Sequence, residues 1–92
     1  MNYTVIFNIS HGEESSQYHK VYEVLGEEYN LKHFEMQDER KVLAPTTTVV
    51  GKNANFKTAQ EMAESIIDRL LKEDITLDRI LVSRGNDYSL IG

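Results

Sequence analysis

Apolar positions near the start of the chain follow first a strand pattern and then a helical pattern. Residues 3–9 are mostly β-branched or aromatic and run into Ser-His-Gly, which predicts a short strand and a turn. The apolar residues that follow recur with the spacing of one helix face: Tyr18, Val21, Tyr22, Leu25 and Tyr29. Ser10 and Glu13 have the spacing of a capping box, and Ser15 or Ser16 are alternative N-caps. We therefore expect a strand followed by an amphipathic helix.

The middle of the chain has the pattern of two strands joined by a charged turn. Residues 32–37 alternate between apolar and polar, which predicts a half-buried strand. Residues 38–41 are all charged, and residues 42–51 contain a run of Thr and Val with high β-propensity. Pro45 lies within that second segment and removes a backbone donor, so we expect an edge strand or a bulge there.

The last third of the chain predicts a second helix and a final strand. After a loop at 51–55, Thr58 and Glu61 form the clearest capping box in the sequence. The helix that begins there should end near residues 73–74 and bury one apolar face: Ala59, Met62, Ala63, Ile66, Ile67 and Leu70. We expect a strand at 79–83, a turn at 85–87, and a short tail over 88–92.

This order of elements, β-α-β-β-α-β, defines the expected fold class. Ninety-two residues make one domain, and the order predicts an α+β, ferredoxin-like two-layer sandwich. In that fold a four-stranded antiparallel sheet carries both helices on one face and leaves its other face open. Because such a face often packs against a second copy, we expect a homodimer.

Composition excludes several classes of protein. The absence of Cys removes disulfides, thiolate metal sites and cysteine nucleophiles. The chain has no apolar run near the ~20 residues needed to span a bilayer, and its first residues lack the features of a signal peptide. We therefore expect a cytoplasmic protein that does not bind a membrane. The net charge of −5 also argues against direct binding to nucleic acid.

The negative charge is unevenly distributed along the sequence. Residues 13–39 contain eight acids and two bases, a net charge of −6, whereas residues 40–92 contain seven acids and eight bases, a net charge of +1. The acids of the first stretch are Glu13, Glu14, Glu23, Glu27, Glu28, Glu35, Asp38 and Glu39. On the predicted second helix, Glu61, Glu64 and Asp68 share the side opposite the apolar face.

These acids have two interpretations. One is an ordinary solvated surface that favours solubility. The other is a surface that copies the charge of a nucleic-acid backbone and so binds a DNA-binding protein. Duplex DNA carries one charge per ~1.7 Å, or about 18 over ~30 Å, so a single copy at −5 falls short. Two aligned 13–39 segments would present about −12, which makes a dimer nearly a requirement of the second interpretation.

Catalytic and metal-binding motifs are weak. None of His11, His19 and His33 forms an i, i+4 pair with another His, so we expect no metal site and no other cofactor. Ser10 beside His11 fits a helix N-cap better than a nucleophile and its base. The element order also resembles that of metal-dependent nucleases of the CRISPR-adaptation type, which carry an Asp at the end of the first strand. This chain has Asn8 there, so we expect no enzyme activity.

Over its whole length the chain resembles the anti-restriction (Arn) family of early T-even bacteriophage proteins. The resemblance runs from its first twelve residues, MNYTVIFNISHG, to its last six, DYSLIG, and no catalytic motif carries it. It implies a non-enzymatic DNA mimic that inhibits a host restriction endonuclease specific for modified cytosine and that also engages a host histone-like nucleoid-structuring protein. The residues we nominate for partner binding are the eleven acids named above, in residues 13–39 and on the second predicted helix.

Overall fold

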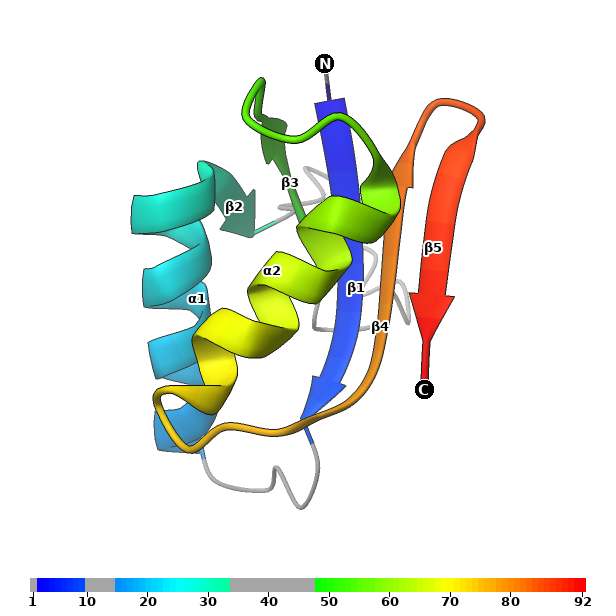
Figure 1. Cartoon of the computed structure of the whole chain (residues 1–92). Helices are drawn as coiled ribbons and strands as arrows, with labels where there is room; N and C mark the ends of the chain where they lie inside the picture. The colour runs from blue at the N-terminus through cyan, green and yellow to red at the C-terminus, as the bar shows by residue number, and fades with distance from the viewer. Residues whose placement is uncertain (1, 10–14, 34–47) are drawn as a thin grey trace, which may run out of the picture.

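The computed structural model describes residues 2–9, 15–33 and 48–92 as a two-layer α+β fold (Figure 1). Along the chain these residues form β1 (Asn2–Ile9), α1 (Ser15–Tyr29), β2 (Leu31–His33), β3 (Thr48–Lys52), α2 (Ala59–Leu71), β4 (Leu77–Arg84) and β5 (Asp87–Ile91). The predicted α+β class and both predicted helices are therefore confirmed.

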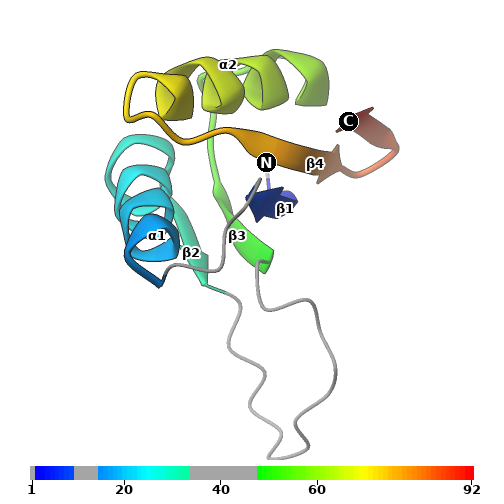
Figure 2. The same ribbon diagram turned by 90° about the horizontal axis from the view of Figure 1, so that it is seen from below.

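All five strands belong to one antiparallel sheet with the order β2-β3-β1-β4-β5. The central strand β1 pairs with β3 on one side and with β4 on the other. Both helices cover the same face of this sheet: α1 lies beside β2, and α2 crosses over β4 and β5 (Figure 2). The two helices and the sheet thus form the two layers that the element order predicts.

The predicted four-stranded sheet is wrong in one respect, because residues 87–91 form a fifth strand instead of a tail. Gly85 adopts a φ of 59°, which lets a two-residue turn connect Arg84 directly to its register partner Asp87. The following side chains alternate in exposure, with Tyr88 and Leu90 exposed and Ser89 and Ile91 half-buried. That period of two is a strand signal, although it extends over only five residues.

The two predicted middle strands are described only in part. β2 contains three residues and β3 five, and the rest of both predicted segments, the turn at 38–41 and Pro45 lie outside the described residues. The short connection from α1 to β2 is tightly packed. Asn30 has a φ of 59°, and a Cβ built on Gly51 would lie 1.9 Å from the Asn30 carbonyl oxygen. Only glycine fits at this contact.

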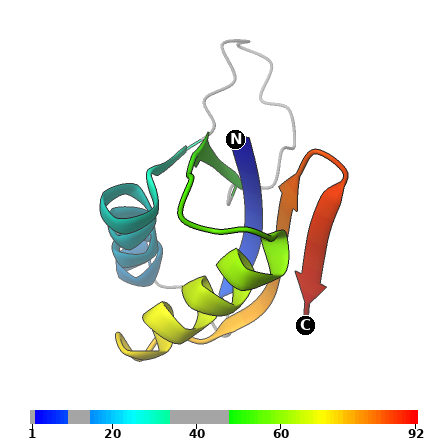
Figure 3. The same ribbon diagram turned by 45° about the horizontal axis from the view of Figure 1, so that its top comes forward.

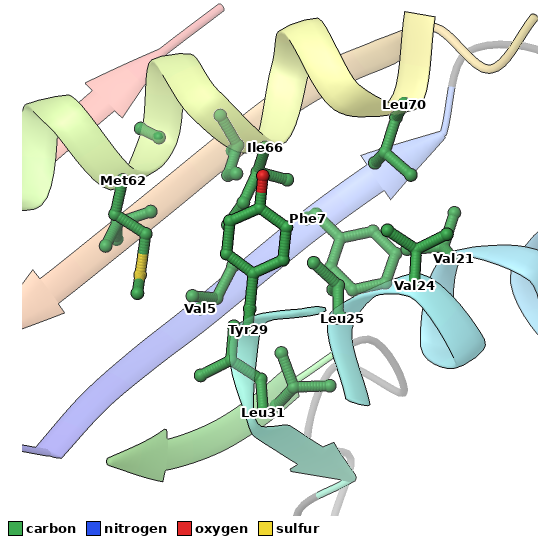
Figure 4. Packing of buried hydrophobic residues seen from close by; sticks show 14 of the residues in the cluster. Val5, Phe7, Val21, Val24, Leu25, Tyr29, Leu31, Met62, Ile66 and Leu70 are labelled. Carbon is green, nitrogen blue, oxygen red and sulfur yellow. The ribbon is translucent and has the colours of Figure 1, made fainter. Parts of the chain in front are cut away.

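The hydrophobic core lies between the sheet and the helices (Figure 4). The predicted stripe of α1 packs there, with Val21, Leu25 and Tyr29 buried and with Tyr18 and Tyr22 partly buried. The predicted face of α2 is buried as well, except that Ile67 is only partly covered. The apolar spacing in the sequence therefore identified the inner face of each helix.

The start of α2 is capped largely as predicted. The Glu61 backbone N–H donates to the Thr58 side-chain oxygen at 3.1 Å. The return bond differs, because the Glu61 carboxylate accepts from the Lys57 N–H at 3.0 Å instead of from Thr58. The predicted cap of α1 at Ser10 and Glu13 lies outside the described residues.

Candidate functional site

Charge separates between the two layers of the molecule. The two helices carry six carboxylates, Glu23, Glu27, Glu28, Glu61, Glu64 and Asp68, against two cations, Lys20 and Arg69, a net charge of −4. The strands carry two carboxylates, Asp78 and Asp87, against Lys32, Lys52, Arg79 and Arg84, a net charge of +2. The most negative stretch of the sequence, residues 13–39, therefore differs from the most acidic part of the described structure, which is the two helices. We refer to the six helix carboxylates as the helix acids.

Three of the helix acids lie on the outer side of α2. Glu61, Glu64 and Asp68 are all exposed, as the helical spacing predicts. Glu61 is occupied in the helix cap, and Glu64 accepts a hydrogen bond from the Gln60 amide at 3.2 Å. These contacts leave capacity for a partner, because a carboxylate accepts several hydrogen bonds at once.

The helix acids of α1 have different electrostatic surroundings. Glu23 is exposed and lies 3.6 Å from the Lys20 ammonium, one turn earlier on the same helix. Glu27 is exposed. Glu28 lies nearer to α2 and contacts Arg69, whose Nε is 2.9 Å and whose Nη2 is 2.8 Å from the carboxylate oxygen Oε2.

Arg69 joins the two helices through this contact. Its guanidinium donates to Glu28 on α1 and also, at 3.0 Å, to Glu73 just beyond the end of α2. The hydrogen bond from Arg69, helped by its positive charge, lowers the pKa of Glu28 below its usual value. The same two carboxylates raise the pKa of Arg69. The Glu28 carboxylate is therefore already paired with Arg69, and this cation largely balances its charge in the absence of a partner.

The Glu28–Arg69 contact was not predicted from the sequence. The two residues are 41 positions apart, and no local pattern relates them. Only the contact of Arg69 with Glu73, at i, i+4 spacing, has a signal in the sequence. Glu28 remains exposed, but it is the nominated acid in the described part of the chain whose charge is most fully matched by a neighbour.

Five of the nominated acids lie outside the described residues: Glu13, Glu14, Glu35, Asp38 and Glu39. The structure therefore gives positions to six of the eleven, and these six are the helix acids. Whether any of them binds a partner remains a prediction.

The sheet face turned away from the helices has the opposite character. Side chains that alternate with the core positions of the strands line this face: Thr4, Ile6 and Asn8 on β1, Thr48, Val50 and Lys52 on β3, Arg79, Leu81 and Ser83 on β4, Tyr88 and Leu90 on β5, and Lys32 on β2. None of these side chains is acidic. We call this set the outer sheet face.

A second polar cluster fastens the start of α2 to the β4–β5 hairpin. Arg84 donates to the Tyr3 hydroxyl at 3.1 Å and to the Phe56 carbonyl at 3.3 Å, and its guanidinium lies 5.4 Å from the centre of the Tyr3 ring. The Asp87 carboxylate accepts from the Ala59 N–H at 2.8 Å and lies 3.7 Å from Arg84. This cluster satisfies backbone polar groups at the start of α2, and it pairs two of the strand charges, Arg84 and Asp87, within the protein.

The residues considered for catalysis and metal binding are only partly described. His19 is exposed on α1, whereas Ser10, His11 and the side chain of His33 lie outside the described residues. Within residues 2–9, 15–33 and 48–92, no three His, Asp or Glu side chains are grouped so that they could hold a metal ion. Asn8, at the position where the nucleases carry Asp, is exposed and pairs in register with Arg79.

The fold class is therefore a two-layer α+β protein with an acidic helix layer. None of the described helices is long and apolar enough to cross a membrane. No protein-family model, curated protein or solved structure matches the chain.

Proposed function

We propose that this protein is a non-enzymatic DNA mimic whose helix acids bind the nucleic-acid-binding surface of a host protein. The observation that carries the proposal is the net charge of −4 on the two helices, which lie on one side of a sheet that is itself net positive. A helix face that serves only solubility does not need this excess of acids. Alternating Glu and Lys at i, i+4 spacing would keep the face equally soluble and would make the helix more stable.

The proposed fold family is ferredoxin-like. The order β2-β3-β1-β4 with two helices on one face supports this assignment, and β5 is then an addition at the β4 edge. Fold alone carries no function, so the assignment adds only a scaffold that holds two helices side by side.

The proposed partners are a host restriction endonuclease that recognises modified cytosine and a host histone-like nucleoid-structuring protein. Both come from the resemblance to the anti-restriction family. Each has a surface that neutralises phosphates with Lys and Arg, and exposed carboxylates offer those side chains a similar charge. Such association is fast and sensitive to salt, because it depends on exposed charges.

The contact residues follow from the geometry of the helix acids. Glu27, Glu64 and Asp68 are exposed, and none of them is within ion-pair distance of a cation in the described residues. Glu28 is held by Arg69, and Glu23 lies beside Lys20. We therefore expect Glu27, Glu64 and Asp68 to contribute more to binding than Glu23 or Glu28.

The experiment is inhibition of the endonuclease on DNA that contains modified cytosine, combined with a binding measurement at increasing salt. Affinity should fall by at least about tenfold between about 50 and about 300 mM salt. The double variant Glu64→Gln/Asp68→Asn should weaken binding. The matched control, Asp74→Asn/Asp78→Asn, removes the same charge outside the helices and should bind nearly as tightly as the wild type. Binding insensitive to salt, or equal loss in both variants, would reject the proposal.

A metal-dependent nuclease is the alternative class, and the same strand order favours it. In that case purified protein would cleave single- or double-stranded nucleic acid in the presence of Mg²⁺ or Mn²⁺. Cleavage that is lost when Asn8 is replaced by Ala would support the nuclease and would count against a purely non-enzymatic role.

A further inference from the structure

Strand β5 forms one edge of the sheet, and its outer side is unpaired among the described residues. It pairs with β4 only, and Figures 1 and 3 show no helix or strand beyond it. An edge strand offers a row of backbone N–H and C=O groups that can pair with a further extended strand.

The strand lacks the features that usually prevent such pairing. Its sequence, DYSLI, contains no Pro and no Lys, and its register with β4 is unbroken from Arg84↔Asp87 to Ile80↔Ile91. Its single charge, Asp87, is turned inward to Ala59 and Arg84. Tyr88 and Leu90, in contrast, are 72% and 58% exposed, and they lie on the same side of the strand. These two side chains make this edge strand apolar, whereas exposed edge strands usually carry charged side chains.

The register of the hairpin determines which backbone groups face outward. A two-residue turn closes on a hydrogen-bonded pair, here Arg84 and Asp87, and bonded residues then alternate along the strand. Asp87, Ser89 and Ile91 are therefore bonded to β4, and Tyr88 and Leu90 direct their N–H and C=O groups away from the sheet.

This pattern is complementary to itself. If β5 pairs antiparallel with another β5 about Ser89, Tyr88 of each copy lies opposite Leu90 of the other. These residues then exchange their outward N–H and C=O groups as hydrogen-bonded pairs. Their exposed side chains also meet on the outer sheet face, and aromatic–aliphatic cross-strand pairs of this kind stabilise sheets. No like charges are opposed in this register.

We propose that two copies of this chain join through β5 to form one sheet that continues across both copies. This inference rests on the proposed function, because that function favours a second copy of the chain as the strand that pairs with β5. Antiparallel pairing of a strand with its own copy places the two-fold axis perpendicular to the sheet. Both helix layers therefore lie on the same side. Because α2 packs on β5, the two α2 helices lie closest to the axis.

The consequence is a single acidic side formed by both copies. The helices contribute a net charge of −4 from each copy, and the dimer places both contributions on one side of the continuous sheet. Packing through the outer sheet faces would instead direct the two helix layers in opposite directions. Of these two arrangements, only pairing through β5 joins the two helix layers into one extended acidic surface.

A cysteine cross-link tests the arrangement directly. The chain contains no Cys, so any disulfide formed by a single introduced Cys joins two copies. In the proposed register Ser89 faces Ser89 of the second copy as a non-hydrogen-bonded pair, with Cα atoms about 4.5 Å apart, a separation compatible with a disulfide. Oxidised Ser89→Cys should therefore run as a covalent dimer. The control Thr4→Cys, at the centre of the outer sheet face, should remain monomeric under the same conditions.

Sedimentation of unlinked variants provides an independent measurement. Leu90→Pro removes an outward N–H and leaves the bonds to β4 intact, so the dimer dissociation constant should rise by at least about tenfold. Leu90→Thr keeps that N–H and should weaken the dimer less. Circular dichroism verifies that both variants are folded.

The outcomes separate this inference from the proposed function. Cross-linking of Thr4→Cys but not of Ser89→Cys would reject β5 pairing in favour of face-to-face packing. Wild-type protein that sediments as a monomer would reject both arrangements. In either case salt-sensitive inhibition of the endonuclease would still support mimicry. A β5 dimer that inhibits nothing would retain this inference and reject the function.

Discussion

The two outer surfaces of this molecule, the exposed side of the helices and the outer sheet face, are built from the same small chain and carry opposite charge. The helix acids give the first a net negative charge, whereas the second contains Lys32, Lys52 and Arg79 and no carboxylate at its strand positions. Residues 13–39, the most negative segment of the sequence, do not by themselves account for this difference. Helix α2 lies in the half of the chain with a net charge of +1, yet it supplies three of the six helix acids. Charge follows the layers of the fold and not the order of the sequence.

The same comparison applies to burial. One face of the sheet packs on two helices and forms the core, whereas the outer sheet face exposes half-buried Ile6 and Leu81 and the more exposed Tyr88 and Leu90. A side chain of the same type therefore contributes differently on the two faces. The variants below test this difference, and they are ordered from the largest expected effect to the smallest.

Truncating an isoleucine on each face of the sheet should give the largest contrast. Ile80 on β4 is 1% exposed beneath α2, so Ile80→Ala should lower the free energy of unfolding by about 3 kcal/mol. Ile6 on β1 is half-buried on the outer sheet face, so Ile6→Ala should cost about 1 kcal/mol. Urea denaturation measures both values. Equal losses would mean that the outer sheet face is as well covered as the core.

Most of the core could be predicted from the sequence, because burial of a helix face depends on spacing within one element. Val21, Leu25, Met62 and Ile66 were all assigned correctly to the inner faces. The features that were missed depend on contacts between elements. β5 is stable as a strand because β4 is its neighbour, and Arg69 reaches Glu28 because the helices lie side by side. The β4–β5 hairpin left only a weak local pattern, a two-residue turn and an alternation over five residues, and the Glu28–Arg69 contact left none. The helix acids were identified as exposed, but the sequence could not show that Glu28 is balanced by Arg69.

Removing the N-cap of α2 should have the next largest effect. Thr58→Ala leaves the Glu61 N–H without its partner, and we expect a loss of about 1 kcal/mol in the free energy of unfolding. Thr58→Ser retains the oxygen and serves as the control. A loss as large with Ser as with Ala would show that the methyl group, not the cap, stabilises this end of the acidic helix.

The contact between the helices should make stability depend on pH in the acid range. The folded pKa of Glu28 is below its unfolded value, so the unfolded state binds more protons as the pH falls through the unfolded pKa. The stabilisation is therefore complete above about pH 5 and is lost progressively as the pH falls through the folded pKa. Because the pair is partly exposed and solvent screens it, Glu28→Gln should lower the free energy of unfolding only slightly at pH 7. It should also flatten the decline in stability that occurs as the pH falls below about 5. Glu27→Gln, one position earlier, is the control and should leave the decline unchanged.

The smallest effect has the opposite sign and addresses why the helix layer is acidic at all. Glu64 has Glu61 three positions before it and Asp68 four positions after it, and no cation occupies its i±3 or i±4 positions. Like charges at these spacings destabilise a helix by a few tenths of a kcal/mol for each pair. Glu64→Gln retains an acceptor for the Gln60 amide and should raise the free energy of unfolding by about 0.5 kcal/mol at low salt, and by less at high salt. Glu73→Gln, which removes a partner of Arg69, should instead lower it. If Glu64→Gln raises stability and also weakens the proposed binding to a partner, Glu64 is retained for the surface it forms and not for the stability of its helix. If Glu64→Gln were neutral at every salt concentration, that argument for selection of the acidic helix layer would fail.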